Sequence, residues 1–191
     1  MKTSTQNNAE KTGRTVSIMA AGKVLCFDFA ELKTFHQGDS WFGCAVGFRT
    51  MQIAARELSA KILWSREQLS VISGHPGAGV RDAIELITAS VSNHRFQLLD
   101  DISDQGCNRQ MKFEWWLTHG DDRLHIKLQD GFVPEPFFTL LDRLNANSEN
   151  RQDKEDFDRI KKDLSDSLWQ QPLEAVFEFE LAPAQPTPAT V

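Results

Sequence analysis

Residues 41–62 read WFGCAVGFRTMQIAARELSAKI and contain the longest helical pattern in the sequence. Apolar residues recur along this stretch at spacings of three and four: Trp41, Cys44, Ala45, Phe48, Met51, Ala55 and Leu58. This period predicts an amphipathic helix. Gly43 and Gly47 lie inside it, and each glycine destabilises a helix interior by about 1 kcal/mol relative to alanine. We therefore expect another segment to approach the backbone of this helix closely.

The segments around this helix alternate between strand and helix patterns and predict an α+β fold. Before it we expect a β-hairpin of residues 15–20 and 23–29 and a short helix of residues 31–37. After it we expect a strand at 68–73, a helix at 80–91, a strand at 96–100 and a hairpin formed by 111–118 and 123–129. Together these elements predict one compact unit over residues 14–130, with a mixed sheet and packed helices.

Residues 131–181 predict a helical C-terminal extension that ends in a strand. Pro134 and Pro136 are typical of a helix start, and this helix should run through Leu144. An amphipathic helix is expected at 152–169, and an uneven alternation predicts an edge or partner-pairing strand at 173–181. The polar residues 1–13 predict a flexible leader, and the proline-rich residues 182–191 predict a disordered tail.

Composition excludes several classes of protein. The 191 residues carry a formal net charge of −6, which argues against nucleic acid as a main partner. No apolar stretch approaches the ~20 residues that a spanning helix needs, so no membrane association is expected. The three cysteines, Cys26, Cys44 and Cys107, are widely spaced and odd in number. They favour a reduced, cytoplasmic protein over a disulfide framework.

Residues 74–79, GHPGAG, lie between a predicted strand and a predicted helix, where backbone N–H groups could hold an anion. A nucleotide-binding loop of this spacing needs Lys and then Ser or Thr after its last glycine. Val80 and Arg81 occupy those positions. The sequence therefore favours a tight strand-to-helix turn, in which Asp82 complements the helix dipole.

Metal-ligand residue types gather in two places. His36, Asp39 and Cys44 surround the start of the glycine-containing helix, and His75 precedes the helix that carries Asp82. A histidine, a carboxylate and a second histidine brought together would suffice for a metal site. Each residue also has a structural interpretation: a backbone-bonded His36, an N-capping Asp39 and a buried, inert Cys44.

The motif QGDSWFG at residues 37–43, followed by CAVGFR, resembles the N-terminal domain of the FmdE family, a family of formylmethanofuran dehydrogenase subunits. That family has a signature of the form His-Gly-His-x-Cys-Pro-Gly before a glycine-containing helix. The residues that match in register are Gly38, Gly43, Gly47 and Arg49, and RDAIE at 81–85 resembles the start of the family's next helix. The resemblance covers residues 36–100 and implies the same α+β domain.

The signature histidines and cysteines of the family are its metal ligands, and this chain departs from them. In the ungapped register they fall on Gln37, Asp39 and Trp41, and a later cysteine falls on Gly79. One inserted residue would place His36 at the first histidine. The resemblance then leaves His36, Asp39 and His75 as a possible site for zinc, iron or manganese, with Cys44 as a possible thiol. It also implies that Trp41 fills the space of the lost ligands.

The resemblance implies two alternative functions. The first is an accessory or binding protein of one-carbon metabolism, linked to formyl-methanofuran or pterins, which would form a homodimer or join a protein partner. The second is a metal-dependent enzyme on a small pterin- or furan-linked substrate, with Arg49 or Arg81 on a substrate carboxylate or phosphate. A third hypothesis, from the chain alone, is an interaction module in which the last helix and strand clamp a partner. The catalytic residues, if there are any, are not identified by the sequence.

Overall fold

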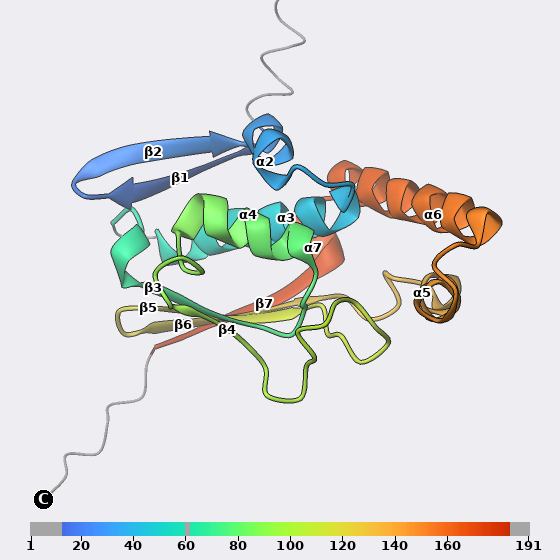
Figure 1. Ribbon diagram of the computed structural model, residues 1–191. Helices are drawn as coiled ribbons and strands as arrows, with labels where there is room; N and C mark the ends of the chain where they lie inside the picture. Colours follow the sequence, from blue (N-terminus) through green and yellow to red (C-terminus); the bar gives the residue numbers. More distant parts are fainter. Residues whose placement is uncertain (1–12, 60–61, 184–191) are drawn as a thin grey trace, which may run out of the picture.

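The computed structural model describes residues 13–59 and 62–183, and within these residues it forms three layers (Figure 1). A β-hairpin and one helix form the first layer, two helices the middle layer and a five-stranded sheet the third. The helices are α2 (Phe29–His36), α3 (Trp41–Leu58), α4 (Ala78–Thr88), α5 (Glu135–Ala146), α6 (Arg151–Gln170) and α7 (Leu173–Val176). The strands are β1 (Thr15–Ala20), β2 (Lys23–Asp28), β3 (Leu69–Ser73), β4 (Phe96–Leu98), β5 (Glu114–His119), β6 (Asp122–Leu128) and β7 (Phe177–Pro183). The predicted α+β class is confirmed.

The large sheet is mixed, with the strand order β4-β3-β5-β6-β7. Strands β3 and β4 are parallel and are connected through α4, whereas the pairs β3–β5, β5–β6 and β6–β7 are antiparallel. Residues that alternate along these strands face α3 and α4, and Trp115, Leu117, Leu124 and Ile126 are almost fully buried there. This alternation is the period of a sheet with one covered face.

Helix α3 is the centre of the core. It lies between the β1–β2 hairpin and the sheet, with α4 beside it (Figure 1). A helix enclosed on several sides loses the polar face of a surface helix, and residues 44–51 are accordingly all buried. The predicted close approach is found here. A Cβ added to Gly47 would lie 2.8 Å from Ala83 Cβ, so the partner is α4 of the same chain.

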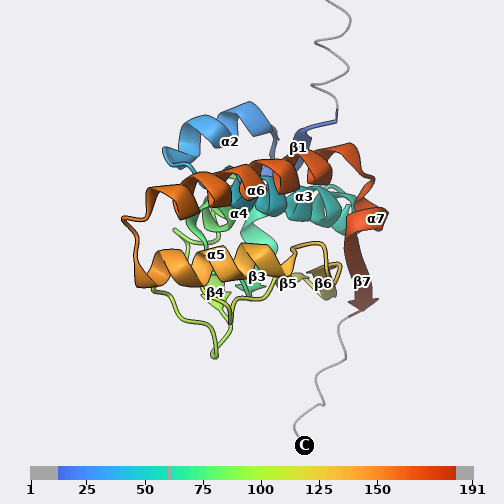
Figure 2. The same ribbon diagram turned by 90° about the vertical axis from the view of Figure 1, so that its right-hand side faces the viewer.

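Residues 131–181 contribute to the same core and sheet as residues 14–130. Helices α5 and α6 pack against each other and α6 packs against α3 (Figure 2). Strand β7 pairs with β6 along its length, with Phe177 opposite Leu128 and Leu181 opposite Leu124. The predicted final strand therefore pairs within the chain.

Some predicted boundaries were wrong. The helix predicted to end at residue 62 ends at Leu58, and the helix predicted at 80–91 is α4, Ala78–Thr88. The first four residues of the predicted strand 173–181 form α7 instead, which begins after Pro172. Ala182, assigned to the disordered tail, pairs with Arg123 at the end of β7. The rest of the predicted tail and most of the predicted leader lie outside the described residues.

In the described part of the chain, none of the helices has both the length and the hydropathy that crossing a membrane requires.

Candidate functional site

His36 is the last residue of α2, and both of its ring nitrogens are engaged. Nδ1 lies 2.7 Å from Oδ2 of Asp82 on α4, and the backbone N–H of Ser40 donates to Nε2 at 3.2 Å. Because Nε2 accepts a hydrogen bond, Nδ1 carries the proton and donates to the Asp82 carboxylate. His36 therefore joins α2, the start of α3 and α4. Neither ring nitrogen is free for a metal ion.

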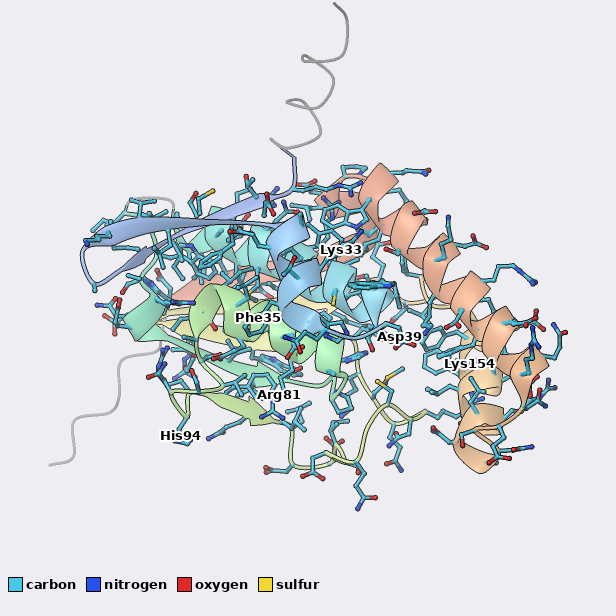
Figure 3. All side chains as sticks on the ribbon, turned by 45° about the horizontal axis from the view of Figure 1, so that its top comes forward. Lys33, Phe35, Asp39, Arg81, His94 and Lys154 are labelled. Atoms are coloured by element: carbon cyan, nitrogen blue, oxygen red, sulfur yellow. The ribbon has the colours of Figure 1, made fainter. Side chains whose placement is uncertain are left out.

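The three predicted metal ligands do not form a common site. Asp39 is exposed on the link between α2 and α3 (Figure 3), and it does not cap α3, whose N-cap residue is Ser40. His75 is buried in the loop after β3, and its Nδ1 accepts from the backbone N–H of Gly77 at 3.0 Å. Among residues 13–59 and 62–183, no group of three or more His, Cys, Asp or Glu side chains is placed to hold a metal ion. The expected His36, Asp39 and His75 set does not fit one.

Arg49 and Cys44 are buried in α3 and serve packing. The Nη2 group of Arg49 donates to the carbonyl of Gln171 at 2.5 Å, and its guanidinium lies 5.4 Å from the ring centre of Trp169. Arg49 thus connects α3 to the end of α6, away from any substrate. Burial and the nearby Asp82 carboxylate raise the pKa of Cys44 to about 12, so the prediction of an inert thiol is confirmed. Trp41 is 41% exposed and fills no interior space.

A cleft of about 560 Å³ lies at the start of α4, and we call it the α4 cleft. One wall is polar and consists of the start of α3, the loop of residues 75–79 and Arg81, which projects from α4 (Figure 3). The opposite wall is apolar and comes from α5 and α6 with Phe42. Residues 104–107 and Lys161 complete the rim.

Two helix N-termini open on the α4 cleft, and neither has a side-chain cap. The N-cap residues Ser40 of α3 and Gly77 of α4 make no capping side-chain bond, and neither helix has an acidic residue in its first turn. The two starts touch, since a Cβ added to Gly79 would lie 2.6 Å from the carbonyl oxygen of Ser40. Uncapped first-turn N–H groups and the positive ends of two helix dipoles favour an anion at this place.

His75 supplies a further donor in the polar wall. The side chain is 4% exposed, and with Nδ1 accepting from Gly77 the proton must be on Nε2. Within the described residues, Nε2 has no hydrogen-bond partner, and His75 lines the cleft. Burial lowers the pKa of His75 to about 4, so the ring is neutral at pH 7 and offers Nε2–H as a donor.

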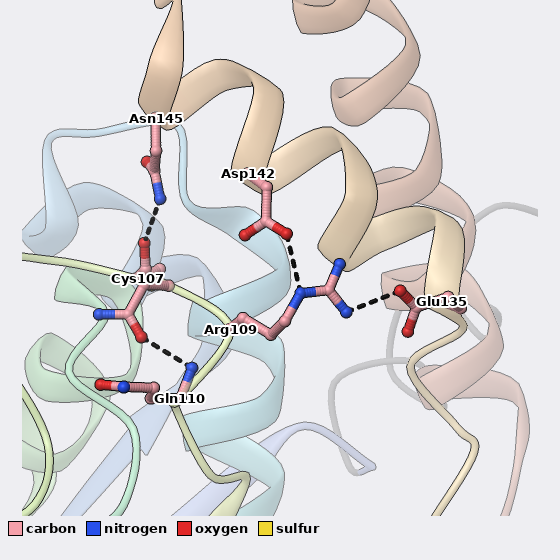
Figure 4. Close-up of polar contacts among 7 residues, drawn as sticks. Cys107, Arg109, Gln110, Glu135, Asp142 and Asn145 are labelled. Carbon is pink, nitrogen blue, oxygen red and sulfur yellow. Dashed lines mark hydrogen bonds and ion pairs between the residues drawn. The ribbon is translucent and has the colours of Figure 1, made fainter.

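The outer wall of the cleft is a long loop between β4 and β5 that is fastened to α5 (Figure 4). Arg109 pairs with Glu135 at 2.6 Å and with Asp142 at 2.8 Å, and the side chain of Asn145 donates to the carbonyl of Cys107 at 3.1 Å. These contacts hold Cys107 against the cleft, where burial raises the pKa of its thiol to about 11.

Sequence reasoning identified part of this site. His75, Arg81 and the loop of residues 74–79 were predicted, whereas Cys107 and Lys161 were not singled out. Lys161 lies on the polar side of a predicted amphipathic helix, where a lysine is ordinarily solvated. Asp82 was predicted beside the site, and the structure places it against His36.

No family model matches the chain, and no curated protein matches it. Its structure is similar to that of a tungsten formylmethanofuran dehydrogenase FmdE-like protein from Syntrophus aciditrophicus. The two chains are 16% identical, the match covers 84% of this chain and 74% of that chain, and the TM-score is 0.44. The likeness is one of overall fold and assigns neither a ligand nor an activity.

Proposed function

We propose that the chain is a binding protein for a small organic anion, which it holds in the α4 cleft. The observation that carries the proposal is the meeting of two uncapped helix N-termini at one cleft, beside the buried Nε2–H of His75. Arg81 adds a positive charge to the same wall. Backbone donors and helix dipoles at such a place favour a carboxylate or a similar anion.

The chemistry of the cleft favours binding over catalysis. His75 has a pKa of about 4, and its Nδ1 already accepts from Gly77, so it is poorly suited to act as a general base near pH 7. The raised pKa of Cys107, about 11, leaves little thiolate for nucleophilic attack. The chain also lacks the Lys and Ser or Thr of a nucleotide-hydrolysing loop after Gly79.

The one-carbon ligand implied by the sequence resemblance is one member of the proposed class, because pterin- and furan-linked cofactors carry acidic groups. A role in one-carbon metabolism, a protein partner and a homodimer stay predictions. Sedimentation of the full chain at micromolar concentration tests the dimer directly.

The proposal is tested by titrating the full chain with acetate, benzoate and inorganic phosphate while recording backbone amide resonances. We expect saturable shifts at Phe42, Gly43, Ala78 and Gly79 with at least one of these anions. The variant Arg81→Gln should bind about tenfold more weakly, since a charge-assisted contact is lost. Arg151→Gln is the matched control, because Arg151 is exposed at the start of α6 and does not line the cleft. Absence of saturable shifts with all three anions would contradict the proposal.

A further inference from the structure

The wall opposite the helix N-termini is built from aromatic rings. Phe42, Phe137 and Phe157 line the α4 cleft, and they come from α3, α5 and α6. The ring centres of Phe42 and Phe137 are 6.0 Å apart in an edge-to-face arrangement, and those of Phe137 and Phe157 are 4.8 Å apart. The series continues on the polar side, where His75 and Phe113 have ring centres 4.7 Å apart.

We propose that the ligand of the α4 cleft is an aromatic monocarboxylate, with its acid group at the two helix starts and its ring against Phe42, Phe137 and Phe157. This inference rests on the proposed function. Aromatic rings in contact prefer edge-to-face and offset arrangements, and such pairs contribute beyond the burial of apolar area. A planar ring added to this wall continues contacts of the kind that the three phenylalanines already make with one another.

The charges around the cleft fit a single negative charge. Arg81 makes no ion pair within the described residues, so its charge is uncompensated. The other cation of the lining, Lys161, is already paired, since its Nζ lies 2.7 Å from a carboxylate oxygen of Asp158. The lining also carries one carboxylate of its own, Asp104, which is exposed. A carboxylate of one charge matches this balance better than a phosphate of two.

The size of the cleft fits a one- or two-ring acid. Pockets for small molecules range from about 300 to 1,000 Å³, and the α4 cleft is about 560 Å³. The buried Nε2–H of His75 gains an acceptor when a carboxylate arrives, which satisfies a donor that otherwise has none in the described structure. The acid group therefore belongs at the polar wall, and the ring occupies the remaining volume beside the phenylalanines.

The test compares acids that share a carboxylate and differ in the group attached to it. Calorimetric titration of the full chain uses benzoate, 2-naphthoate, cyclohexanecarboxylate and acetate. We expect the two aromatic acids to bind about tenfold or more tightly than acetate, and about 3- to 10-fold more tightly than the saturated ring. Phenyl phosphate is included to separate the single charge from the double one, and it should bind more weakly than benzoate.

Phe157→Leu keeps an apolar side chain and removes the ring. It should weaken the aromatic acids about 3- to 10-fold and leave the affinity for acetate unchanged. Phe35→Leu is the matched control, because Phe35 is exposed on α2 and does not line the cleft. Thermal unfolding of both variants verifies that they fold.

The outcomes separate this inference from the proposed function. Equal affinities for benzoate, cyclohexanecarboxylate and acetate would overturn the aromatic ligand and leave an anion site. Tighter binding of phenyl phosphate than of benzoate would overturn the single charge. Failure of every acid, inorganic phosphate included, would overturn both proposals.

Discussion

Ala83 of α4 lies where a side chain on Gly47 of α3 would have to go: a Cβ added to Gly47 would be 2.8 Å from the Cβ of Ala83. The same added atom would be 3.0 Å from Cα and 3.1 Å from the carbonyl oxygen of Val80. Two of these three neighbours are backbone atoms, so they cannot move aside as a flexible side chain would. The crossing of α3 and α4 depends on the missing side chain, and this crossing also brings the two helix starts together at the α4 cleft.

Gly47→Ala should lower the free energy of unfolding by about 1–2 kcal/mol, because the cost of overpacking, about 1–3 kcal/mol, exceeds the gain of about 1 kcal/mol in helix propensity. Gly43→Ala is the control in the same helix, one turn earlier. Its added Cβ would meet Val80 N at 3.5 Å, an ordinary contact, so it should be neutral or stabilising by up to about 1 kcal/mol. Urea unfolding measures both, and equal effects would contradict the close crossing.

The close approach could be predicted from the sequence, because two glycines weaken a strongly apolar helix unless another segment packs against its backbone. The partner could not, since nothing local distinguishes α4 of the same chain from a second copy. The strand predicted at 173–181 shows a different limit. Its alternation of Ala, Phe and Glu satisfies a strand period, but Pro172 starts a helical turn that persists through Val176. Local turn chemistry prevailed over the period there.

The predicted metal site failed for a physical reason as well. A histidine's ligand role depends on which groups face its two nitrogens, and for His36 the partner is Asp82, which lies 46 residues further along the chain. For His75 the partner is local, the N–H of Gly77, and it occupies the nitrogen that a metal would need. Residue type and spacing located both histidines near the functional region, and only the tertiary structure shows what they contact.

The contact between His36 and Asp82 should contribute to stability. The histidine side chain is 3% exposed, so removing its acceptor leaves a buried N–H without a partner. Asp82→Ala should lower the free energy of unfolding by about 1–3 kcal/mol. Glu114→Ala is the matched control, because Glu114 also accepts from a histidine, His125, whose side chain is 39% exposed. It should cost less than about 1 kcal/mol. A greater loss for the exposed pair, in chemical denaturation of both variants, would sink the assignment.

The three thiols should react with iodoacetamide in a fixed order. Cys26 is exposed on β2 and should be alkylated first at pH 8. Cys107 follows more slowly, because its pKa is raised to about 11 and it is half-buried at the cleft. Cys44, with a pKa of about 12 and no exposure, should react only after unfolding. Peptide mass spectrometry over time measures the order. A bound ligand should slow Cys107 and leave Cys26 unchanged, so protection of both would show an effect outside the cleft.

Stability should fall in acid through His75. Its pKa is lowered from 6.5 to about 4 in the folded chain because burial disfavours the imidazolium. Between these values the unfolded chain binds more protons at this residue than the folded chain does, so the free energy of unfolding rises with pH. The contribution is therefore complete above pH 6.5 and is lost as the pH falls toward 4. Its full size is about 3 kcal/mol, from the 6.5 to about 4 interval.

Two measurements separate His75 from the carboxylates that titrate in the same range. Between pH 6.5 and 4, His75→Gln should show a shallower loss of unfolding free energy than the unaltered chain, while His94→Gln, at an exposed turn residue, should reproduce the unaltered slope. His119, whose pKa burial also lowers, adds to the slope of all three proteins with the same sign. If His75→Gln does not fold, the imidazole resonance of His75 in the unaltered chain gives the answer, and titration of that resonance near pH 6.5 would contradict a buried, neutral ring.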